Sequence, residues 1–133
     1  MTNGAKKVYY NFNPDLPKPL HVIHPGHVKY IQKLLSMPIP EGVSTIFLFG
    51  SSLDPACDRW NDIDLYAIVD SGDVNTTRRA LYSLCKKLNH PFDLLASDRE
   101  TFLDYVYDIG TVENDILHKG VCIYAKDEKS DSA

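Results

Sequence analysis

The sequence predicts an α+β (α/β-like) fold, in which short apolar strands alternate with amphipathic helices. The chain has 133 residues, and single hydrophobic cores usually hold roughly 100–200 residues, so one domain is expected. With 44% apolar and 24% charged residues, the composition is typical of a globular protein. Apolar residues gather in short runs in some segments, as in buried strands, and recur at helical spacing in others.

Residues 1–25 are expected to form a proline-containing N-terminal arm. Proline fixes φ and removes a backbone donor, so this segment cannot be one continuous helix. The prolines concerned are Pro14, Pro17, Pro19 and Pro25. Residues 7–12 are a candidate edge strand. Residues 26–125 have the pattern of a folded domain, and residues 126–133 are expected to be a polar, flexible tail.

The first three elements of the domain are predicted to be a helix and two strands. Apolar residues recur at helical spacing over residues 27–36, and Pro38 and Pro40 end that helix. Residues 44–49 form a short apolar run bounded by glycines, which predicts a buried strand. Residues 62–70 contain β-branched and aromatic residues and predict a second strand.

A helix, a strand and a second helix are predicted next. Residues 74–88 have one apolar side and a basic remainder, which indicates an amphipathic helix with a solvated basic face. Residues 92–96 predict a third strand. Ser97 and Glu100 have the spacing of a capping box for a helix over residues 98–107.

The domain is predicted to end with another helix and a strand. Thr111 is a candidate N-cap for a helix that runs to residue 119 and ends at Gly120. Residues 121–125 predict the last strand. Tyr105 and Tyr107, just before this helix, are expected to pack against neighbouring elements.

Composition and charge exclude several classes of function. No apolar run approaches the ~20 residues that span a bilayer, and no signal-peptide pattern opens the chain. The chain has 14 basic and 18 acidic residues, a net charge of −4, so bulk binding to nucleic acid is not expected. Cys57, Cys85 and Cys122 are widely spaced and odd in number, which favours a reducing compartment. A cytoplasmic protein with no membrane association is therefore expected.

Three aspartates carry the strongest indication of chemistry. Residues i and i+2 of a strand point to the same face about 6.6 Å apart, so Asp62 and Asp64 are expected to project side by side. Asp93 begins a later strand and can add a third carboxylate. Clustered carboxylates repel one another, and Mg²⁺ relieves this because it prefers oxygen ligands completed by substrate phosphates.

Gly50 and Ser51 supply a complementary anion-binding feature at the end of the preceding strand. Glycine lets a phosphate approach the backbone closely. A short helical turn that begins at Ser51 would present free N–H groups to that phosphate. Together the two features predict a site for a triphosphate and a metal.

These residues resemble the nucleotidyltransferase superfamily of DNA polymerase β, and specifically its minimal members in bacteria and archaea. Ten residues separate Gly50-Ser51 from Asp62-Ile63-Asp64, and Asp93 follows in a later apolar strand. The resemblance implies a palm domain, with a mixed β-sheet packed against helices, two Mg²⁺ ions, and transfer of a nucleoside monophosphate from ATP or another nucleoside triphosphate.

The resemblance also implies a role for each residue. Asp62, Asp64 and Asp93 are the metal ligands and catalytic residues, and Asp93 can accept the proton of the acceptor hydroxyl. Nucleotide binding falls to Gly50, Ser51 and Ser52. Many minimal members are antitoxins encoded beside HEPN-domain toxins, and some add AMP to the toxin. A protein partner of that kind, or a homo-oligomer, is therefore expected.

Two other functions stay open. The arginine that often follows the glycine and serine is absent, and Arg59 is a candidate substitute, so the chain can instead be a catalytically weak antitoxin that masks its partner. A small-molecule nucleotidyltransferase, of the aminoglycoside-modifying type, is the other alternative. Trp60 is a candidate to stack on the base or to cover the core.

Three histidines at every third position invite a metal-binding interpretation. They are His21, His24 and His27. Pro25 disfavours helical geometry at the residue before it, so solvated loop histidines are expected instead.

Overall fold

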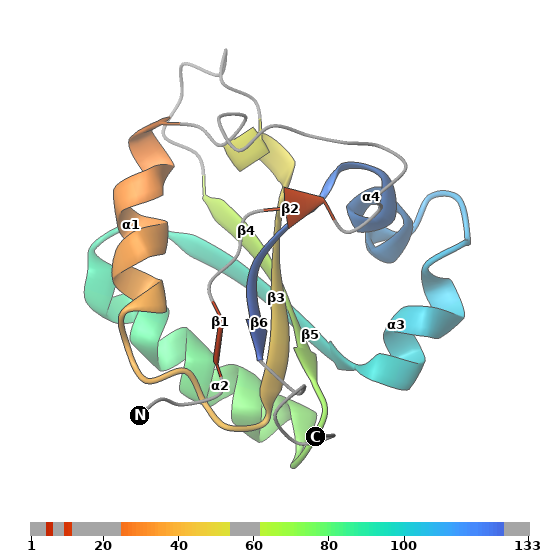
Figure 1. Ribbon diagram of the computed structural model, residues 1–133, viewed down its shortest axis with the longest axis horizontal. Coiled ribbons are helices and arrows are strands. Elements are labelled where there is room, and N and C mark those ends of the chain that lie inside the picture. Colours follow the sequence, from red (N-terminus) through yellow and green to blue (C-terminus); the bar gives the residue numbers. More distant parts are fainter. Residues whose placement is uncertain (1–4, 7–9, 12–24, 54–61, 127–133) are drawn as a thin grey trace.

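A mixed β-sheet forms the central layer of the computed structural model, and helices lie on both of its faces (Figure 1). The structure describes residues 5–6, 10–11, 25–53 and 62–126. The strands are β1 (Ala5–Lys6), β2 (Tyr10–Asn11), β3 (Val43–Phe49), β4 (Ile63–Val69), β5 (Phe92–Asp98) and β6 (Val121–Lys126). The helices are α1 (Pro25–Leu35), α2 (Val74–Cys85), α3 (Arg99–Tyr105) and α4 (Val112–Lys119), with 3₁₀ turns η2 (Gly50–Leu53) and η3 (Lys86–Leu88).

The strands follow the order β1-β6-β3-β4-β5, and β2 also pairs with β6. β3 is antiparallel to both β4 and β6, whereas β4 and β5 are parallel. A parallel pair needs a crossover connection, which α2 provides. The predicted α+β class, with a mixed sheet packed against helices, is therefore confirmed.

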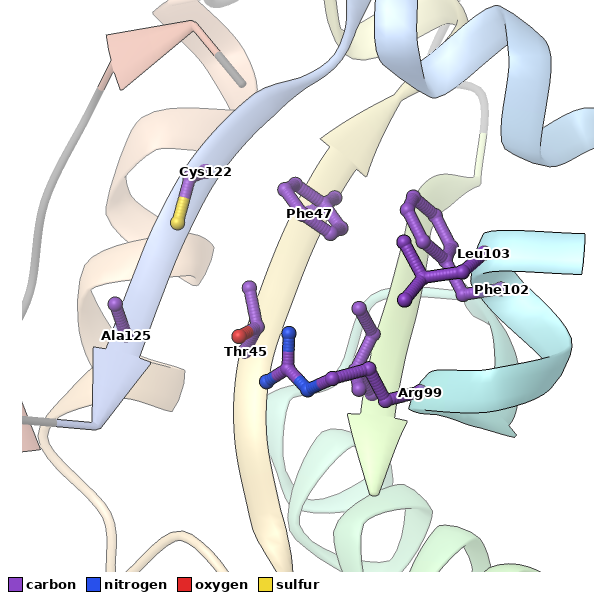
Figure 2. Close-up of a pocket in the computed structure, with 8 residues that line it drawn as sticks. Thr45, Phe47, Arg99, Phe102, Leu103, Cys122 and Ala125 are labelled. Atoms are coloured by element: carbon purple, nitrogen blue, oxygen red, sulfur yellow. The ribbon is translucent and has the colours of Figure 1, made fainter. Parts of the chain in front are cut away.

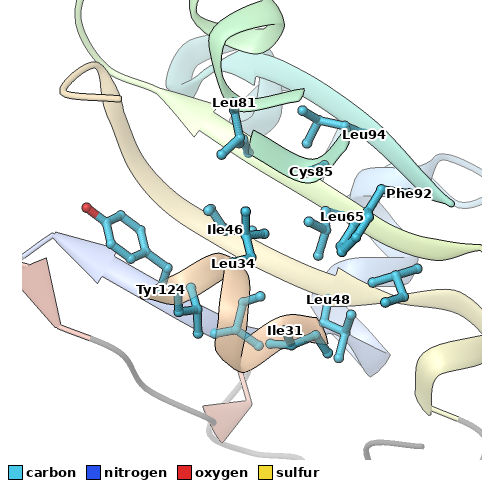
Figure 3. Close-up of a cluster of buried hydrophobic side chains, with 14 of the residues drawn as sticks. Ile31, Leu34, Ile46, Leu48, Leu65, Leu81, Cys85, Phe92, Leu94 and Tyr124 are labelled. Atoms are coloured by element: carbon cyan, nitrogen blue, oxygen red, sulfur yellow. The ribbon is translucent and has the colours of Figure 1, made fainter. Parts of the chain in front are cut away.

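The first face of the sheet is covered by α1 and α2 (Figure 3). Apolar residues at helical spacing on these helices meet alternate residues of the strands. From the helices come Ile31, Leu34, Leu81 and Cys85, and from the strands Ile46, Leu48, Leu65 and Leu94. Fully burying one such aliphatic side chain contributes about 1.5–3 kcal/mol, so this layer is the main source of stability.

The second face is covered by α3 and α4 around a smaller cluster. Phe47 of β3 stacks on Phe102 of α3 with ring centres 5.7 Å apart, and Tyr66 meets Phe102 edge-on at 5.5 Å. Val106 and Ile116 complete the contact between the two helices and the sheet. This face also carries the chemistry described below.

The helix starts show one correct and one wrong prediction. Thr111 caps α4 as expected, because its hydroxyl accepts a hydrogen bond from the Asn114 N–H. The capping box at Ser97 is wrong, since Asp98 caps α3. Ser97 belongs to β5, and its hydroxyl lies 2.6 Å from that of Tyr66.

Two expectations about aromatic side chains are also wrong. His27 lies within α1 and is buried, with its ring edge-on to His90 at 5.1 Å, so it is a packing residue rather than a solvated one. Tyr105 and Tyr107 are exposed, at 48% and 78%, because α3 ends at Tyr105 and Val106, between them, is the residue that packs into the core. His21, His24, Arg59 and Trp60 lie outside the described residues.

None of the described helices is both long enough and apolar enough to cross a membrane.

Candidate active site

The starts of β4 and β5 bring the predicted aspartates together. These two strands are parallel and in register, so Asp64 pairs with Asp93 across the sheet. Residues in register on neighbouring strands point to the same face. Asp62 stands just before β4, two residues from Asp64, and is exposed, as is Asp93. The register of the sheet therefore gathers carboxylates that are far apart in the sequence.

Asp64 is the carboxylate on which the environment acts most strongly. Burial first, and then the negative charges of Asp93 and Asp62, raise the pKa of Asp64 to about 6. The effect of both neighbours means that the three groups act on one another electrostatically. A concentration of negative charge of this kind favours the binding of a cation.

Gly50, directly after β3, lies against the carboxylate of Asp64. β3 ends at Phe49, which pairs with Asp64, and the chain then turns through Gly50 with φ of +74°. A Cβ at Gly50 would overlap a carboxylate oxygen of Asp64. The backbone of Gly50 thus lies directly against the carboxylate, a position that only glycine fills without strain.

The predicted nucleotide-binding residues lie on the turn that follows. Gly50, Ser51 and Ser52 are all in η2, a short 3₁₀ helix directly after β3. The helical turn expected near Ser51 is therefore present. The segment from residue 54 to residue 61 lies outside the described part of the chain.

The donor set fits Mg²⁺ in part. Mg²⁺ is usually held by one or two carboxylates plus substrate phosphates, and Asp64 and Asp93 provide that many oxygen ligands on one face. Among the residues that the structure describes, no three histidine, cysteine, aspartate or glutamate side chains converge to hold a metal ion. The arrangement fits an ion whose coordination a nucleotide would complete.

A hydrogen-bonded group next to the aspartates was missed by sequence reasoning. The Tyr66 hydroxyl donates to Oε2 of Glu113 on α4 at 2.6 Å and lies 2.6 Å from Oγ of Ser97 on β5. Burial, followed by Glu113, raises the pKa of Tyr66. The available signal was the spacing from Asp64 to Tyr66, which places both on one face; nothing local indicated that α4 would reach them.

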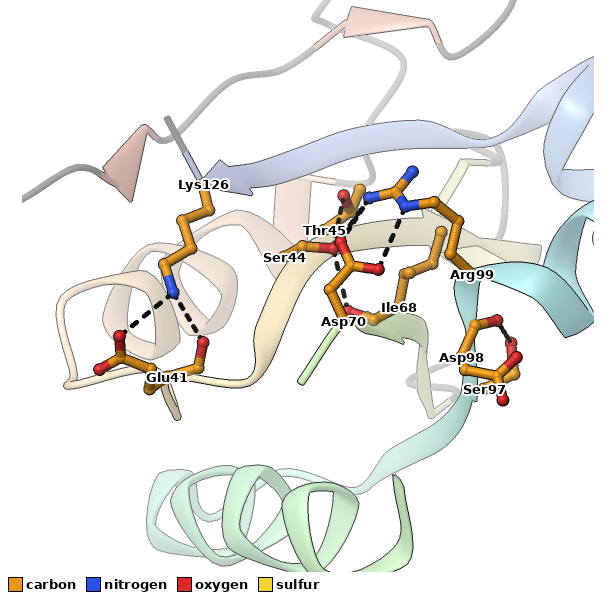
Figure 4. Close-up of polar contacts among 9 residues, drawn as sticks. All are labelled: Glu41, Ser44, Thr45, Ile68, Asp70, Ser97, Asp98, Arg99 and Lys126. Atoms are coloured by element: carbon orange, nitrogen blue, oxygen red, sulfur yellow. Dashed lines mark hydrogen bonds and ion pairs between the residues drawn. The ribbon is translucent and has the colours of Figure 1, made fainter. Parts of the chain in front are cut away.

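At the other end of β4, the carboxylate of Asp70 is paired with the guanidinium of Arg99 (Figure 4). Nη2 and Nε of Arg99 donate to the two carboxylate oxygens of Asp70, at 2.7 and 3.1 Å. Nη2 also donates to Oγ of Ser44 at 3.2 Å. This pairing lowers the pKa of Asp70. The group holds α3 on the sheet and requires no ligand.

Comparisons with known proteins add two structural likenesses. No protein-family model and no curated protein matches this chain. One solved structure, a toxin-antitoxin with AMP-PNP, is 27% identical to this chain and has a TM-score of 0.40. The alignment spans 68% of this chain and 79% of that chain. Another, a mutant of the toxin-antitoxin MntA-HpeT, is 22% identical and has a TM-score of 0.39. That alignment spans 70% of this chain and 80% of the other chain.

Proposed function

We propose that this protein is a Mg²⁺-dependent nucleotidyltransferase that transfers a nucleoside monophosphate, AMP from ATP, to a hydroxyl group of a partner protein. The observation that carries the proposal is the in-register pair Asp64 and Asp93, set against the backbone of Gly50. A carboxylate with a raised pKa, next to like charges and near the start of a strand, has no structural explanation and is typical of a functional site.

Asp62, Asp64 and Asp93 are the groups proposed to hold two Mg²⁺ ions. Bound there, the ions would supply charge neutralisation to the phosphates and acidify the acceptor hydroxyl. Asp93 is exposed, so it can reach that hydroxyl and accept its proton. The acceptor oxygen then bonds to the α-phosphorus, the bond from that phosphorus to the bridging oxygen of the β-phosphate breaks, and pyrophosphate leaves.

Gly50 is proposed to keep the space beside Asp64 open for the triphosphate. A side chain there would occupy the position of the carboxylate oxygen. The backbone of η2, with Ser51 and Ser52, is proposed to bind the phosphates. A protein acceptor, of the HEPN-toxin kind, follows from the resemblance of the Gly50 to Asp93 residues to the antitoxin-type minimal enzymes. A cytoplasmic location is supported by Cys85 and Cys122, which are buried free thiols.

The proposal is tested first by nucleotide binding. In thermal-shift assays, Mg²⁺ together with a non-hydrolysable ATP analogue should raise the melting temperature of the wild type and leave that of Asp64→Asn unchanged. Asp104→Asn, on the exposed side of α3, is the matched control and should respond like the wild type. An equal response from Asp64→Asn would place the nucleotide elsewhere.

Transfer is tested on the partner that co-purifies with the chain from native cells. After incubation with Mg²⁺ and ATP, intact-mass measurement should show the partner heavier by one AMP. Asp62→Ala, Asp64→Asn and Asp93→Asn should each abolish that increase. Labelling by any of these variants at the wild-type rate would contradict its assigned role.

A second candidate function is that of a binding module that masks the partner without modifying it. It is favoured by the sequence after Gly50 and Ser51, which has no arginine over residues 52–56. Neutralisation of the partner by Asp64→Asn, at wild-type strength, would support masking. Loss of neutralisation in that variant, with binding intact, would support catalysis.

A further inference from the structure

Charge is segregated between two surfaces of this protein. The first, here termed the basic face, is the outer side of α2 and η3. It consists of Arg78, Arg79, Tyr82, Lys86 and Lys87, and no acidic residue occurs from residue 74 to residue 88. Arg78, Tyr82 and Lys86 are four residues apart and so share one side of the helix. Nζ of Lys86 lies 6.0 Å from the centre of the Tyr82 ring, which is 37% exposed.

The second surface, here termed the acidic corner, comprises the end of α3, the turn after it and the start of α4. It has no lysine or arginine from residue 100 to residue 115. Its exposed acidic residues include Glu100, Asp104 and Asp108. Between them stand exposed apolar side chains, namely Leu103 at 54%, Tyr105 at 48%, Tyr107 at 78% and Ile109 at 95%. Four large apolar side chains exposed within seven residues exceed the scattered single exposures of an ordinary surface, which is typical of a protein-binding segment.

A cavity of about 210 Å³ opens beside this corner (Figure 2). Leu103 and Phe102 form one wall, and Phe47 and Cys122 lie on the sheet beneath, with Arg99 reaching across. A cavity of ~150 Å³ already admits a benzene ring, so this volume is sufficient for one aromatic side chain. An anchor residue in such a pocket is the usual centre of a protein interface.

We propose that the acidic corner binds the basic face of a second copy of this chain, with Tyr82 of that copy opposite the cavity. The two surfaces have opposite charge, and each combines charged groups with exposed aromatic rings. Tyrosine and arginine, which the basic face provides, are the residues most enriched at the centres of interfaces. The complement of the corner is therefore present on the chain itself.

The positions of the two surfaces determine the kind of assembly. α2 packs on one face of the sheet and α3 and α4 on the other (Figure 1). Two copies therefore associate head to tail, and each pair keeps one unused basic face and one unused corner. Such heterologous contacts propagate into rings or filaments rather than stopping at a dimer.

Sedimentation of the full-length chain at two salt concentrations tests the proposal. At about 50 mM NaCl the weight-average mass should exceed the monomer mass of 15.0 kDa and rise with protein concentration. At about 500 mM NaCl, where exposed charges are screened, it should return to 15.0 kDa. A monomer at every concentration in low salt would overturn the proposal and leave the corner to a different partner.

Two triple variants test which surfaces meet. The basic-face variant carries Arg79→Gln, Tyr82→Ser and Lys86→Gln, all at exposed positions. It should remain at the monomer mass in low salt. Lys33→Gln, an exposed lysine on α1, is the control and should assemble like the wild type. Wild-type assembly by the basic-face variant would overturn the proposal.

The corner variant carries Leu103→Ser, Asp104→Asn and Tyr107→Ser, also at exposed positions. It too should be monomeric alone. In an equal mixture, each variant keeps one intact surface, so the mixture should reach twice the monomer mass and stop there. A mixture that stays monomeric, or that assembles further, would contradict a head-to-tail contact between these two surfaces. Circular dichroism of both variants verifies that the fold is retained.

Discussion

The two ends of β4 carry the same residue type in opposite physical states. At its start, Asp64 lies beside Asp93 and close to Asp62, so negative charges are brought together. Just after its end, Asp70 accepts two hydrogen bonds from Arg99. The pKa of Asp64 is raised to about 6, whereas that of Asp70 is lowered.

The difference separates a structural carboxylate from a functional one. Asp70 joins α3 to the sheet, and its charge is matched by an arginine of this same chain. Asp64 is ionised at the expense of stability, because burial and like charges oppose its charge. Groups of this second kind cluster at sites where a ligand supplies the missing charge. The predictions below test that contrast, from the largest expected effect to the smallest.

The largest effect is expected from Gly50→Ala. The added Cβ would overlap the Asp64 carboxylate, and φ of +74° is itself unfavourable for alanine. Displacing a reacting group by about 1 Å can cost about 100-fold in rate, so transfer activity should fall by at least that factor. Gly110→Ala is the control, because φ is +96° there but no atom lies within 4 Å of its Cβ position.

Activity in Gly110→Ala should stay within about twofold of the wild type, since backbone strain alone costs only about 1 kcal/mol of stability. Equal activity losses in the two variants would mean that strain, and not contact with Asp64, explains the need for glycine at residue 50.

The next effect is a gain in stability from Asp64→Asn, measured without divalent cations. Asp64 ionises at about pH 6 in the folded chain and at its ordinary value of 3.8 when unfolded. Folding therefore favours the protonated form of Asp64. The stability that this form contributes is fully present below pH 3.8 and is lost as the pH rises through about 6. Allowing for solvent screening, the variant should be about 1–2 kcal/mol more stable at pH 7.

Urea unfolding at pH 4 and pH 7 measures this difference. The gap between Asp64→Asn and the wild type should widen with pH. A gap that is constant or narrows would mean that burial and the like charges of Asp93 and Asp62 do not raise the pKa of Asp64.

Sequence reasoning found the members of the site but not the contacts that create it. Asp62 and Asp64 follow from the two-residue period of a strand, and the Gly50 turn from its position after an apolar run. The pairing of Asp64 with Asp93 depends on the register of two strands about thirty residues apart, which only packing fixes.

Local patterns were wrong where tertiary contacts competed with them. Ser97 has the spacing of a cap, but its side chain points to Tyr66, and the next residue caps α3 instead. His27 was expected in a solvated loop because Pro25 disfavours helical geometry at the residue before it. Proline is nevertheless tolerated in the first turn of a helix, and α1 begins at Pro25. The side of α1 that meets the sheet then buries the histidine.

A smaller effect is expected from Tyr66→Phe. The variant loses the hydroxyl that donates to Glu113, so it should lose about 1–2 kcal/mol of stability. Because this bond joins α4 to β4, hydrogen exchange of the α4 amides should also become faster. Tyr105→Phe, whose ring is 48% exposed, is the control and should leave both measurements unchanged. Unchanged exchange in Tyr66→Phe would mean that apolar packing alone holds α4.

The smallest effect is expected from Asp70→Asn. Its ion pair with Arg99 is partly exposed, at 32% and 49%, so the loss should be below about 1 kcal/mol and should shrink in high salt. The sign is opposite to that at Asp64. The pKa of Asp70 is lowered, so its contribution is present above the ordinary value of 3.8 and lost as the pH falls through the lower folded value.

The wild type should therefore exceed Asp70→Asn in stability at pH 7, and the difference should disappear in acid. Asp64→Asn, in contrast, should be more stable than the wild type at pH 7, and this advantage should shrink as the pH falls. The aspartates at the two ends of β4 would then give stability profiles of opposite slope with pH, and slopes of the same sign would mean that the two ends of β4 do not differ in kind.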